Sequence, residues 1–174
     1  LKLLIIADAQ DTDTPQRETT DIIRNSIRTS SPDLIILLGD NIAGNFDGVT
    51  PEKTKEAVKK VLEPICEKKL PFALVFGNHD HEGLKNRCGF GEKEAKEFIL
   101  EEFMRYPGCL AVKGEPESGV GTYNLPVKSS DGSKTVFNLW LMDSGTYDDN
   151  GGYGFVQPDQ TEWYINTSEQ LKAE

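Results

Sequence analysis

Three short runs of almost purely apolar residues, each followed by polar side chains, constrain the fold of this chain more than any other feature. The runs span residues 3–7, 34–38 and 72–76. Continuous apolar runs of this length are typical of strands that are buried on both faces of a sheet. Between them lie amphipathic patterns that predict helices over residues 17–29 and from residue 51 onward. The order strand–helix–strand–helix–strand predicts an α/β fold with a mainly parallel sheet and right-handed connections.

The second half of the chain has a different pattern. We expect a helix over residues 92–105, a short strand over residues 110–112 and a final helix over residues 158–173. Two further strands, residues 122–127 and 135–143, flank the dipeptide Asp131-Gly132, which favours a hairpin turn, so these strands should be antiparallel. Pro64 lies inside the second predicted helix, where it predicts a kink or a helix end nearby.

Composition excludes several classes of protein. The 174 residues carry a formal net charge of −10, which argues against a general binder of nucleic acid or of anionic membranes, because those partners need basic patches. No apolar run approaches the roughly 20 residues of a membrane span. The three cysteines form no CxxC pair, which excludes a cysteine zinc knuckle. We therefore expect a soluble domain, and both a cytoplasmic and an exported location stay open.

Each predicted parallel strand is followed by residues that can bind a hard cation. Asp8 and Gln10 follow the first strand, Asp40 follows the second, and Asn78 and His79 follow the third. The carboxyl ends of parallel strands meet at one edge of a sheet, and ligands of such sheets bind there. Oxygen donors with one imidazole suit Mn, Fe, Zn or Mg. Taken singly, the same residue types also cap ordinary turns, so the residues alone leave both a metal site and a set of capped turns open.

The order of these residues resembles a known family. Asp8-Ala9-Gln10, Gly39-Asp40-Asn41 and Gly77-Asn78-His79-Asp80 are similar to the first three motifs of the calcineurin-like metallophosphoesterases, above all of their purple-acid-phosphatase-like bacterial branch. Asp143-Ser144-Gly145 and the helix with Gln160 and Trp163 extend the resemblance over the whole chain. The resemblance implies an α/β/β/α sandwich, with a mainly parallel first sheet, additional antiparallel strands and two divalent or trivalent metal ions at its edge.

The resemblance also implies roles for single residues. Asp40 matches the carboxylate that bridges the two metals, Asp8 and Gln10 match ligands of the first metal, and Asn78 matches a ligand of the second. A metal-held water attacks phosphorus while the cations polarise the phosphoryl oxygens. His79 matches the histidine that contacts the phosphoryl group and helps the leaving oxygen depart. The implied function is hydrolysis of a phosphate monoester or diester, with a phosphorylated molecule as the substrate.

The chain departs from the family pattern at two positions within these motifs. Gln10 stands where the family has a histidine, and a neutral amide oxygen binds cations less strongly than imidazole. Ala43 stands where many relatives carry the aspartate that orients the catalytic histidine. Asn45 and Asp47 are the candidates to replace that aspartate.

The largest departure is that no histidine follows His81, whereas the family completes its site with a further His and a Gly-His-x-His motif. We therefore interpret residues 1–174 as the N-terminal portion of a single metallophosphoesterase domain, which alone would be inactive or weak. The alternative is a degenerate, non-catalytic module that binds a cation or a phosphorylated ligand. A nucleotide-binding doubly wound domain fits less well, because the first strand lacks a glycine-rich phosphate loop after it.

Four further side chains have two open interpretations. We expect His81 to lie on the loop surface, although a residue so close to a strand end can also reach the cleft. The aromatic residues Tyr147, Tyr153 and Phe155 lie in or beside the Gly/Asp-rich loop over residues 143–153. We expect them to anchor this loop in the core, and the alternative is that they line a substrate cleft.

Overall fold

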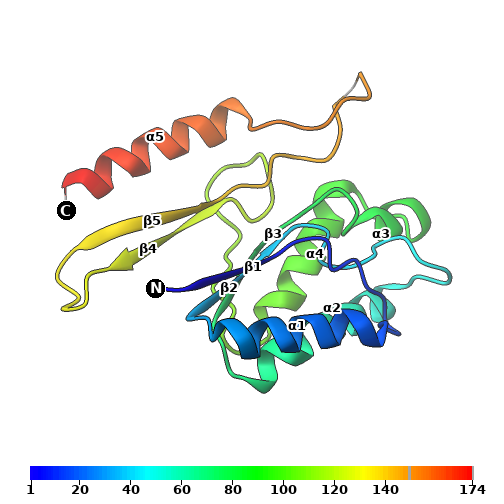
Figure 1. Ribbon diagram of the computed structural model, residues 1–174. Helices are drawn as coiled ribbons and strands as arrows, with labels where there is room; N and C mark the ends of the chain where they lie inside the picture. Colours follow the sequence, from blue (N-terminus) through cyan, green and yellow to red (C-terminus); the bar gives the residue numbers. More distant parts are fainter. Residues whose placement is uncertain (149, 174) are drawn as a thin grey trace.

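A three-stranded parallel sheet lies at the centre of the computed structural model (Figure 1). Its strands, in the spatial order β1-β2-β3, are β1 (Leu3–Ile6), β2 (Leu34–Leu38) and β3 (Phe72–Val75). Leu3 pairs with Leu34, and Ile35 pairs with Phe72. Helices α1 (Arg17–Ser30) and α2 (Pro51–Glu67) connect the strands. The predicted alternation of strands and helices and the parallel sheet are therefore confirmed.

The elements stack in layers. Figure 1 shows α5 (Pro158–Ala173) above the hairpin of β4 (Tyr123–Lys128) and β5 (Thr135–Leu141), then the parallel sheet, then the layer of α1, α2 and α4 (Glu92–Met104). The hairpin is antiparallel, as predicted, with Tyr123 opposite Leu141. The rings of Trp163 and Tyr164 on α5 meet the ring of Trp140 on β5 edge-on. This is the α/β/β/α arrangement that the resemblance implied.

Apolar side chains from the parallel sheet and from the helices packed on it form the core, with the largest share from α2 and α4. All four residues of β3 are buried, and so are the inward residues of α2 and α4, namely Ala57, Val58, Val61, Leu62, Ile65, Ala95, Ile99 and Phe103. Tyr123 joins the two sheets, because its hydroxyl donates to the Leu74 carbonyl at 2.9 Å and accepts from the Leu74 amide at 3.0 Å. The core therefore holds the parallel sheet firmly beneath its carboxyl edge.

Three predictions about single elements were wrong or incomplete. β1 is not buried on both faces, because it lies at the edge of the sheet and Ile5 is exposed. No strand forms over residues 110–112, and Cys109 makes only a single parallel bridge with Phe72. The sequence patterns did not reveal the short helix α3 (Glu82–Arg87). Pro64 is buried inside α2, and the helix ends three residues later at Glu67, close to where the proline predicts an end.

The structure describes residues 1–148 and 150–173. Residue 149, within the expected Gly/Asp-rich loop, and residue 174, the last of the predicted domain, lie outside the described residues. Across the described ranges, none of the helices has the length and apolarity needed to cross a membrane. The three cysteines, Cys66, Cys88 and Cys109, are free thiols.

Candidate active site

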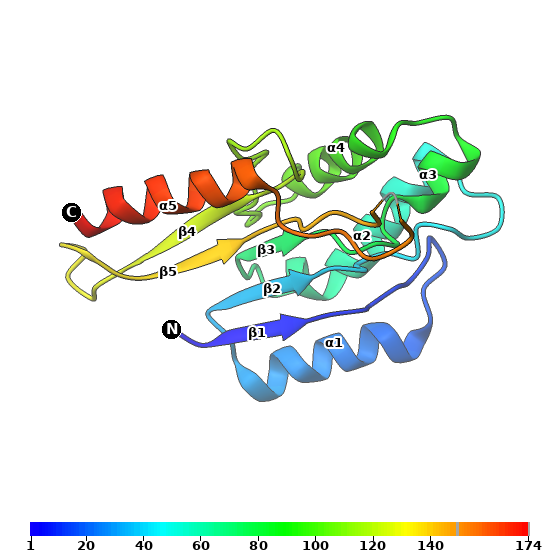
Figure 2. The ribbon, with the colours of Figure 1, turned by 90° about the horizontal axis from the view of Figure 1, so that it is seen from above.

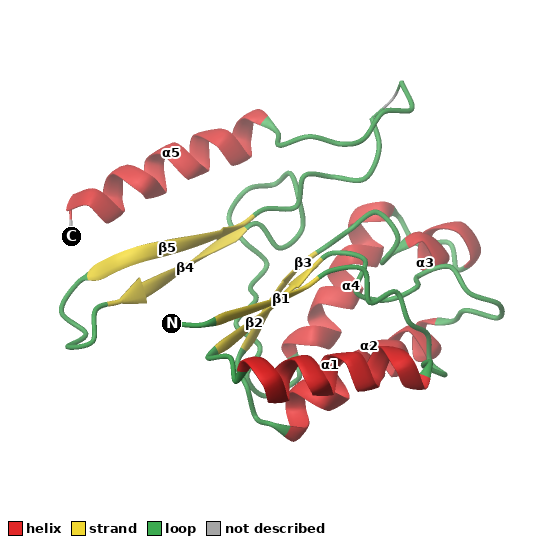
Figure 3. Ribbon diagram, in the orientation of Figure 1, coloured by secondary structure: helices red, strands yellow, loops and turns green. Residues whose placement is uncertain are grey.

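The carboxyl ends of β1, β2 and β3 point to the same edge of the sheet, next to α3 (Figure 2). Loops gather at this edge (Figure 3). Three non-glycine residues in these loops, Asp8, Gln10 and Asp40, have left-handed backbone, with φ of 54°, 39° and 47°. Such backbone costs roughly 1 kcal/mol or more per residue and concentrates at functional sites. A hydrogen bond between the loops supports this conformation, because the backbone N–H of Gln10 donates to the backbone carbonyl of Asp40 at 2.9 Å.

Asp40 brings the three strand ends together. Its Oδ2 accepts a hydrogen bond from Nε2 of Gln10 at 3.1 Å, and its Oδ1 accepts one from the backbone amide of His79 at 2.9 Å. The loop after β3 can approach this closely only because residue 77 is a glycine, since a Cβ there would overlap the Asp40 carboxylate. Gln10, Asp40 and His79, which the sequence placed after three different strands, therefore meet at one point.

Asp80 connects the loops that carry the site residues. Its buried carboxylate accepts the amides of Asn41 at 2.7 Å, Ile42 at 3.0 Å and Gly77 at 2.8 Å. Burial raises the pKa of Asp80 to about 6, and the three N–H donors oppose that rise. The carboxylate is thus ionised at neutral pH, and it fastens the loop after β2 to the loop after β3.

His79 has a carboxylate partner that the sequence did not reveal. Its Nδ1 lies 2.9 Å from Oε2 of Glu82, and this hydrogen bond is the main reason why the pKa of His79 is raised. Neither Asn45 nor Asp47 bonds to His79 within the described ranges, and Asp47 instead lies 3.7 Å from Arg87. Glu82 begins α3, so the i, i+3 spacing from His79 was the one available signal, and it required knowing that a helix starts there.

Among the described residues, the side chains of Asp8 and Asn78 make no hydrogen bond to this cluster. The Asn78 amide nitrogen donates to the Tyr147 hydroxyl at 2.9 Å, and the exposed Asp8 carboxylate accepts no hydrogen bond from any described residue. Two carboxylates and two amides have the chemistry that a hard cation prefers. Within the described ranges, no three His, Cys, Asp or Glu side chains gather at one point. Asp8, Gln10, Asp40 and Asn78 therefore have oxygen donors of the kind that a hard cation prefers, and the structure brings only Gln10 and Asp40 into direct contact.

His81 is not on the loop surface, contrary to our expectation. It is 1% exposed beneath α4, with Nε2 3.8 Å from Oε2 of Glu92 and Nδ1 without a partner among the described residues. Burial, reinforced by the nearby charge of Lys96, lowers the pKa of His81 to about 4. The imidazole is therefore neutral at physiological pH and belongs to the core rather than to the cleft.

The depressed pKa of His81 predicts a loss of stability in acid. Because His81 takes up a proton more readily in the unfolded chain, its contribution is fully present above its ordinary pKa of 6.5 and decreases as pH falls toward 4. We expect this group to lower the free energy of unfolding by about 2 kcal/mol between about pH 7 and about pH 4.5. Urea unfolding of the full-length protein at the two pH values measures the change, and His81→Leu should reduce it. An unchanged pH dependence in His81→Leu would contradict this prediction.

The charges that face His81 explain why the comparison with His81→Leu is needed. They are Lys96, Glu92, Lys85 and Asp143. Glu92 itself has a pKa lowered to about 2. Burial raises this pKa, but the hydrogen bonds from Lys85 and Thr146 lower it by more. Its stabilising contribution is lost only below its ordinary pKa of 4.5. Asp80, whose pKa is raised to about 6, titrates between pH 6.5 and pH 4 with the opposite sign, so the difference between wild type and His81→Leu is the quantity that reports on the histidine.

The three aromatic side chains do not anchor their loop in the core, contrary to our expectation. Tyr147 is 53% exposed, Tyr153 76% and Phe155 59%. The rings of Tyr147 and Tyr153 stack with centroids 5.8 Å apart. The hydrogen bond from Asn78 to Tyr147 places this stacked pair directly beside the strand ends.

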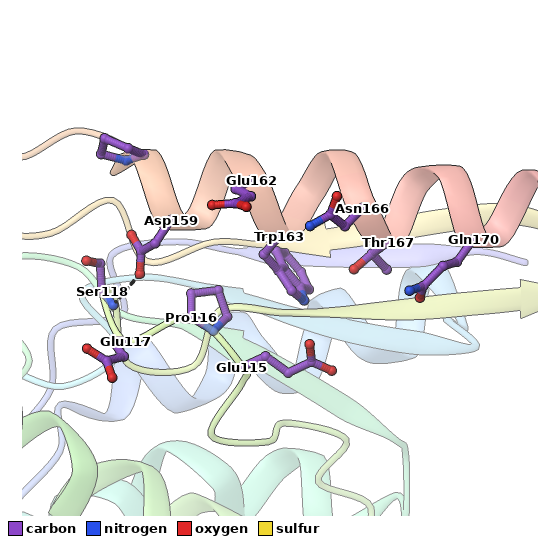
Figure 4. A pocket seen from close by; sticks show the side chains of 11 residues that line it. Glu115, Pro116, Glu117, Ser118, Asp159, Glu162, Trp163, Asn166, Thr167 and Gln170 are labelled. Atoms are coloured by element: carbon purple, nitrogen blue, oxygen red, sulfur yellow. Dashed lines mark hydrogen bonds between the residues drawn. The ribbon is translucent and has the colours of Figure 1, made fainter.

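A cavity of about 760 Å³ lies elsewhere, between α5 and residues 115–118 (Figure 4). Acidic side chains surround it, and Trp163 contributes an indole wall. Asp159 accepts a hydrogen bond from the Ser118 amide at 2.9 Å across one end. None of the residues that follow the three parallel strands lines this cavity, so it is separate from the candidate active site.

Comparison with known proteins places the chain among phosphoesterases. Residues 1–171 match a family model described as calcineurin-like phosphoesterase. The chain is 29% identical to "Probable inactive purple acid phosphatase 14" of Arabidopsis thaliana over 90% of its length, and 31% identical to "Probable inactive purple acid phosphatase 29" of that plant, also over 90%. It is 26% identical to "Phosphatase DCR2" of Saccharomyces cerevisiae over 84% of its length.

The chain spans 39%, 40% and 25% of the lengths of these three relatives, respectively. Their plant and yeast origin lends no support to the bacterial part of the resemblance. The names of the two plant relatives agree with its purple-acid-phosphatase part. The family match covers nearly every residue and agrees with the α/β/β/α layers and with the three strand-end motifs. The chain therefore belongs to the calcineurin-like phosphoesterase family.

Proposed function

We propose that the intact protein is a metal-dependent phosphoesterase that hydrolyses a phosphate monoester or diester. The observation that carries this proposal is the convergence of Gln10, Asp40 and His79 at the carboxyl edge of the sheet, in a chain of this family. A buried carboxylate that contacts the other two motifs is the arrangement that a shared cation ligand needs. The acidic composition adds no basic surface for nucleic acid, so the proposed partner is a small or peptide-borne phosphoester.

The side chains divide into cation ligands and a proton donor. Asp8, Gln10, Asp40 and Asn78 would hold the cations, which supply polarisation of the phosphoryl oxygens and acidification of a bound water. Glu82 bonds to Nδ1 of His79 and thereby leaves Nε2 as the ring atom that is free to face a substrate. His79 donates the proton from Nε2 to the departing alcohol oxygen. The raised pKa of His79 keeps this proton in place nearer to neutral pH.

A second function is favoured by one specific observation. The amide nitrogen of Gln10 donates to Oδ2 of Asp40, so it occupies an oxygen that a cation would otherwise share. Two of the plant relatives also carry the word "inactive" in their names. The competing proposal is therefore a module that binds a cation or a phosphorylated ligand without turnover.

Metal removal and replacement tests the two functions against each other. Full-length protein stripped with a chelator should hydrolyse an aryl phosphate only slowly. Mn²⁺, Fe²⁺, Zn²⁺ or Mg²⁺ should raise the rate about a hundredfold or more above that of the stripped protein, because the cation would activate the attacking water and stabilise the developing charge. Calorimetry with Mn²⁺ and inorganic phosphate runs in parallel. Binding without turnover under every metal would favour the non-catalytic module, and the absence of both binding and turnover would exclude the two proposals.

A further inference from the structure

We propose that the stacked pair Tyr147–Tyr153 binds the aromatic group of an aryl phosphate, so that the site prefers phosphoesters of phenol-type alcohols. This inference rests on the proposed function, because it assumes that a phosphoryl group binds at the strand ends. It names the substrate class that the site would select. Three observations carry it, namely the position of the pair, its exposure and the hydrogen bonds of the described residues beside it.

The pair stands directly beside the proposed phosphoryl site. The Tyr147 hydroxyl accepts the Asn78 amide at 2.9 Å, and Asn78 lies within the same turn as His79. One hydrogen bond therefore connects the aromatic pair to a proposed cation ligand. In an aryl phosphate the ring is separated from phosphorus by a single oxygen, so a phosphoryl group at the strand ends carries its ring toward these tyrosines.

The rings are presented to solvent instead of being packed away. Tyr147 and Tyr153 are 53% and 76% exposed, although both rings carry large apolar surfaces that proteins usually cover. Their planes are 30° apart in a stacked arrangement with centroids 5.8 Å apart, so they already form a short stack that a third ring can extend. Phe155 on the same loop is also exposed and widens the aromatic surface.

Hydrogen bonds hold the loop so that the rings need no burial to stay in place. The Asp148 carboxylate accepts the Asn150 amide at 2.9 Å and the Gly152 amide at 2.6 Å, which closes the turn between the two tyrosines. The Gly154 amide donates to the Thr146 carbonyl at 3.2 Å, and Tyr147 and Tyr153 form an antiparallel bridge. The two tyrosines therefore face each other across an antiparallel bridge, which we call the tyrosine hairpin.

The base of this hairpin is fastened to the rest of the domain. The Thr146 hydroxyl donates to Oε1 of Glu92 on α4 at 2.7 Å, and the Gly145 amide donates to the buried Asp143 carboxylate at 3.0 Å. A Cβ at Gly154 would overlap the backbone of Ser144 and Gly145, so the two sides of the hairpin cross at close range. A surface held in place before a ligand arrives loses little entropy on binding, which favours a recognition role.

The test compares two non-hydrolysable ligands, phenylphosphonate and methylphosphonate, by calorimetry on Mn²⁺-loaded full-length protein. We expect wild-type protein to bind phenylphosphonate more tightly, and Tyr153→Leu to reduce the ratio of the two affinities about fivefold, the order of one lost ring stack. Tyr153 is the residue to change because Tyr147 also contacts Asn78. The matched control is Tyr164→Leu on α5, which removes another partly exposed tyrosine, one that packs on the ring of Trp140 in β5. The control should leave the ratio unchanged.

The outcomes separate this inference from the proposed function. An affinity ratio that is unchanged in Tyr153→Leu, or no preference in wild-type protein, would overturn the aromatic site even if phosphoesters are hydrolysed. A ratio that depends on Tyr153 in a protein without turnover would support the aromatic site and overturn the catalytic proposal. Failure of both phosphonates to bind would overturn the aromatic site, whereas the proposed function would still be decided by turnover of an aryl phosphate.

Discussion

We expect the replacement of Asp40 with asparagine to lower kcat/KM of the metal-loaded full-length protein for an aryl phosphate by about 10³-fold, because the proposed phosphoesterase activity depends on this carboxylate. Asn has the size of Asp and keeps one oxygen to accept the His79 amide, so the loops retain their packing. It has lost the negative charge, and it presents an NH₂ group where Gln10 also presents one. The new NH₂ group therefore repels a cation that Asp40 would bind. The site also lacks the negative carboxylate charge that would attract the cation.

The matched control for Asp40→Asn is Asp47→Asn. Asp47 is fully exposed seven residues further along the chain, and its ion-pair partner is Arg87 at the surface. We expect Asp47→Asn to stay within about twofold of the wild-type rate, since exposed pairs contribute little. Steady-state kinetics and Mn²⁺ calorimetry measure both variants. If Asp40→Asn, or the harsher Asp40→Ala, kept wild-type activity, the assignment of this edge as the active site would be wrong.

The sequence predicted this edge of the sheet because the signal is local and repeated. Each apolar run can only be a buried or half-buried strand, and parallel topology then carries the residues after every run to one place. Gln10, Asp40 and His79 meet for this reason, although 30 or more residues separate each strand end from the next. The same reasoning overestimated the burial of β1, because an apolar run does not reveal whether a strand lies at the centre or at the edge of a sheet.

The residues that the sequence did not reveal depend on contacts between distant segments. Helix α3 has six residues and contains Gly83, so it has no repeating pattern, and without it neither Glu82 nor the burial of His81 could be inferred. Aromatic residues are buried more often than not, and that tendency predicted an anchored loop where Tyr147 and Tyr153 are exposed. Only the path of the hairpin after Asp143 determines their place.

Lys96 is the clearest case of a misleading pattern, and it leads to the second large effect. It stands among glutamates on α4 and has the sequence context of a solvated helix face, yet it is 3% exposed. Its Nζ lies 3.1 Å and 2.9 Å from the two oxygens of Asp143, which is also buried. The same carboxylate accepts the amides of Val120 and Gly145. Asp143 therefore joins α4 to the loop before β4 and to the tyrosine hairpin, the segment that carries Tyr147 and Tyr153.

Lys96→Met should lower the free energy of unfolding by about 3–5 kcal/mol, because it leaves the Asp143 carboxylate buried without its counter-charge. Methionine fills a similar volume, so loss of packing adds little. Chemical denaturation of the full-length protein measures the change. The matched control, Lys93→Met, removes an exposed lysine of the same helix whose hydrogen-bond partner among the described residues is the Glu117 carbonyl. It should cost less than about 1 kcal/mol.

The double variant Lys96→Met with Asp143→Asn decides whether charge is the cause. The Val120 and Gly145 backbone amides bond to different oxygens of Asp143, so asparagine can accept only one of them. It carries no charge, however, that needs a partner. The double variant should therefore be more stable than Lys96→Met alone, since removing both charges avoids the penalty of one unpaired ion. If the two substitutions instead destabilised additively, the cost of Lys96→Met would lie in packing. The tyrosine hairpin is also held by the hydrogen bond from Thr146 to Glu92, which neither substitution removes. It should therefore keep its place in the double variant, so that ligand preference and stability change independently.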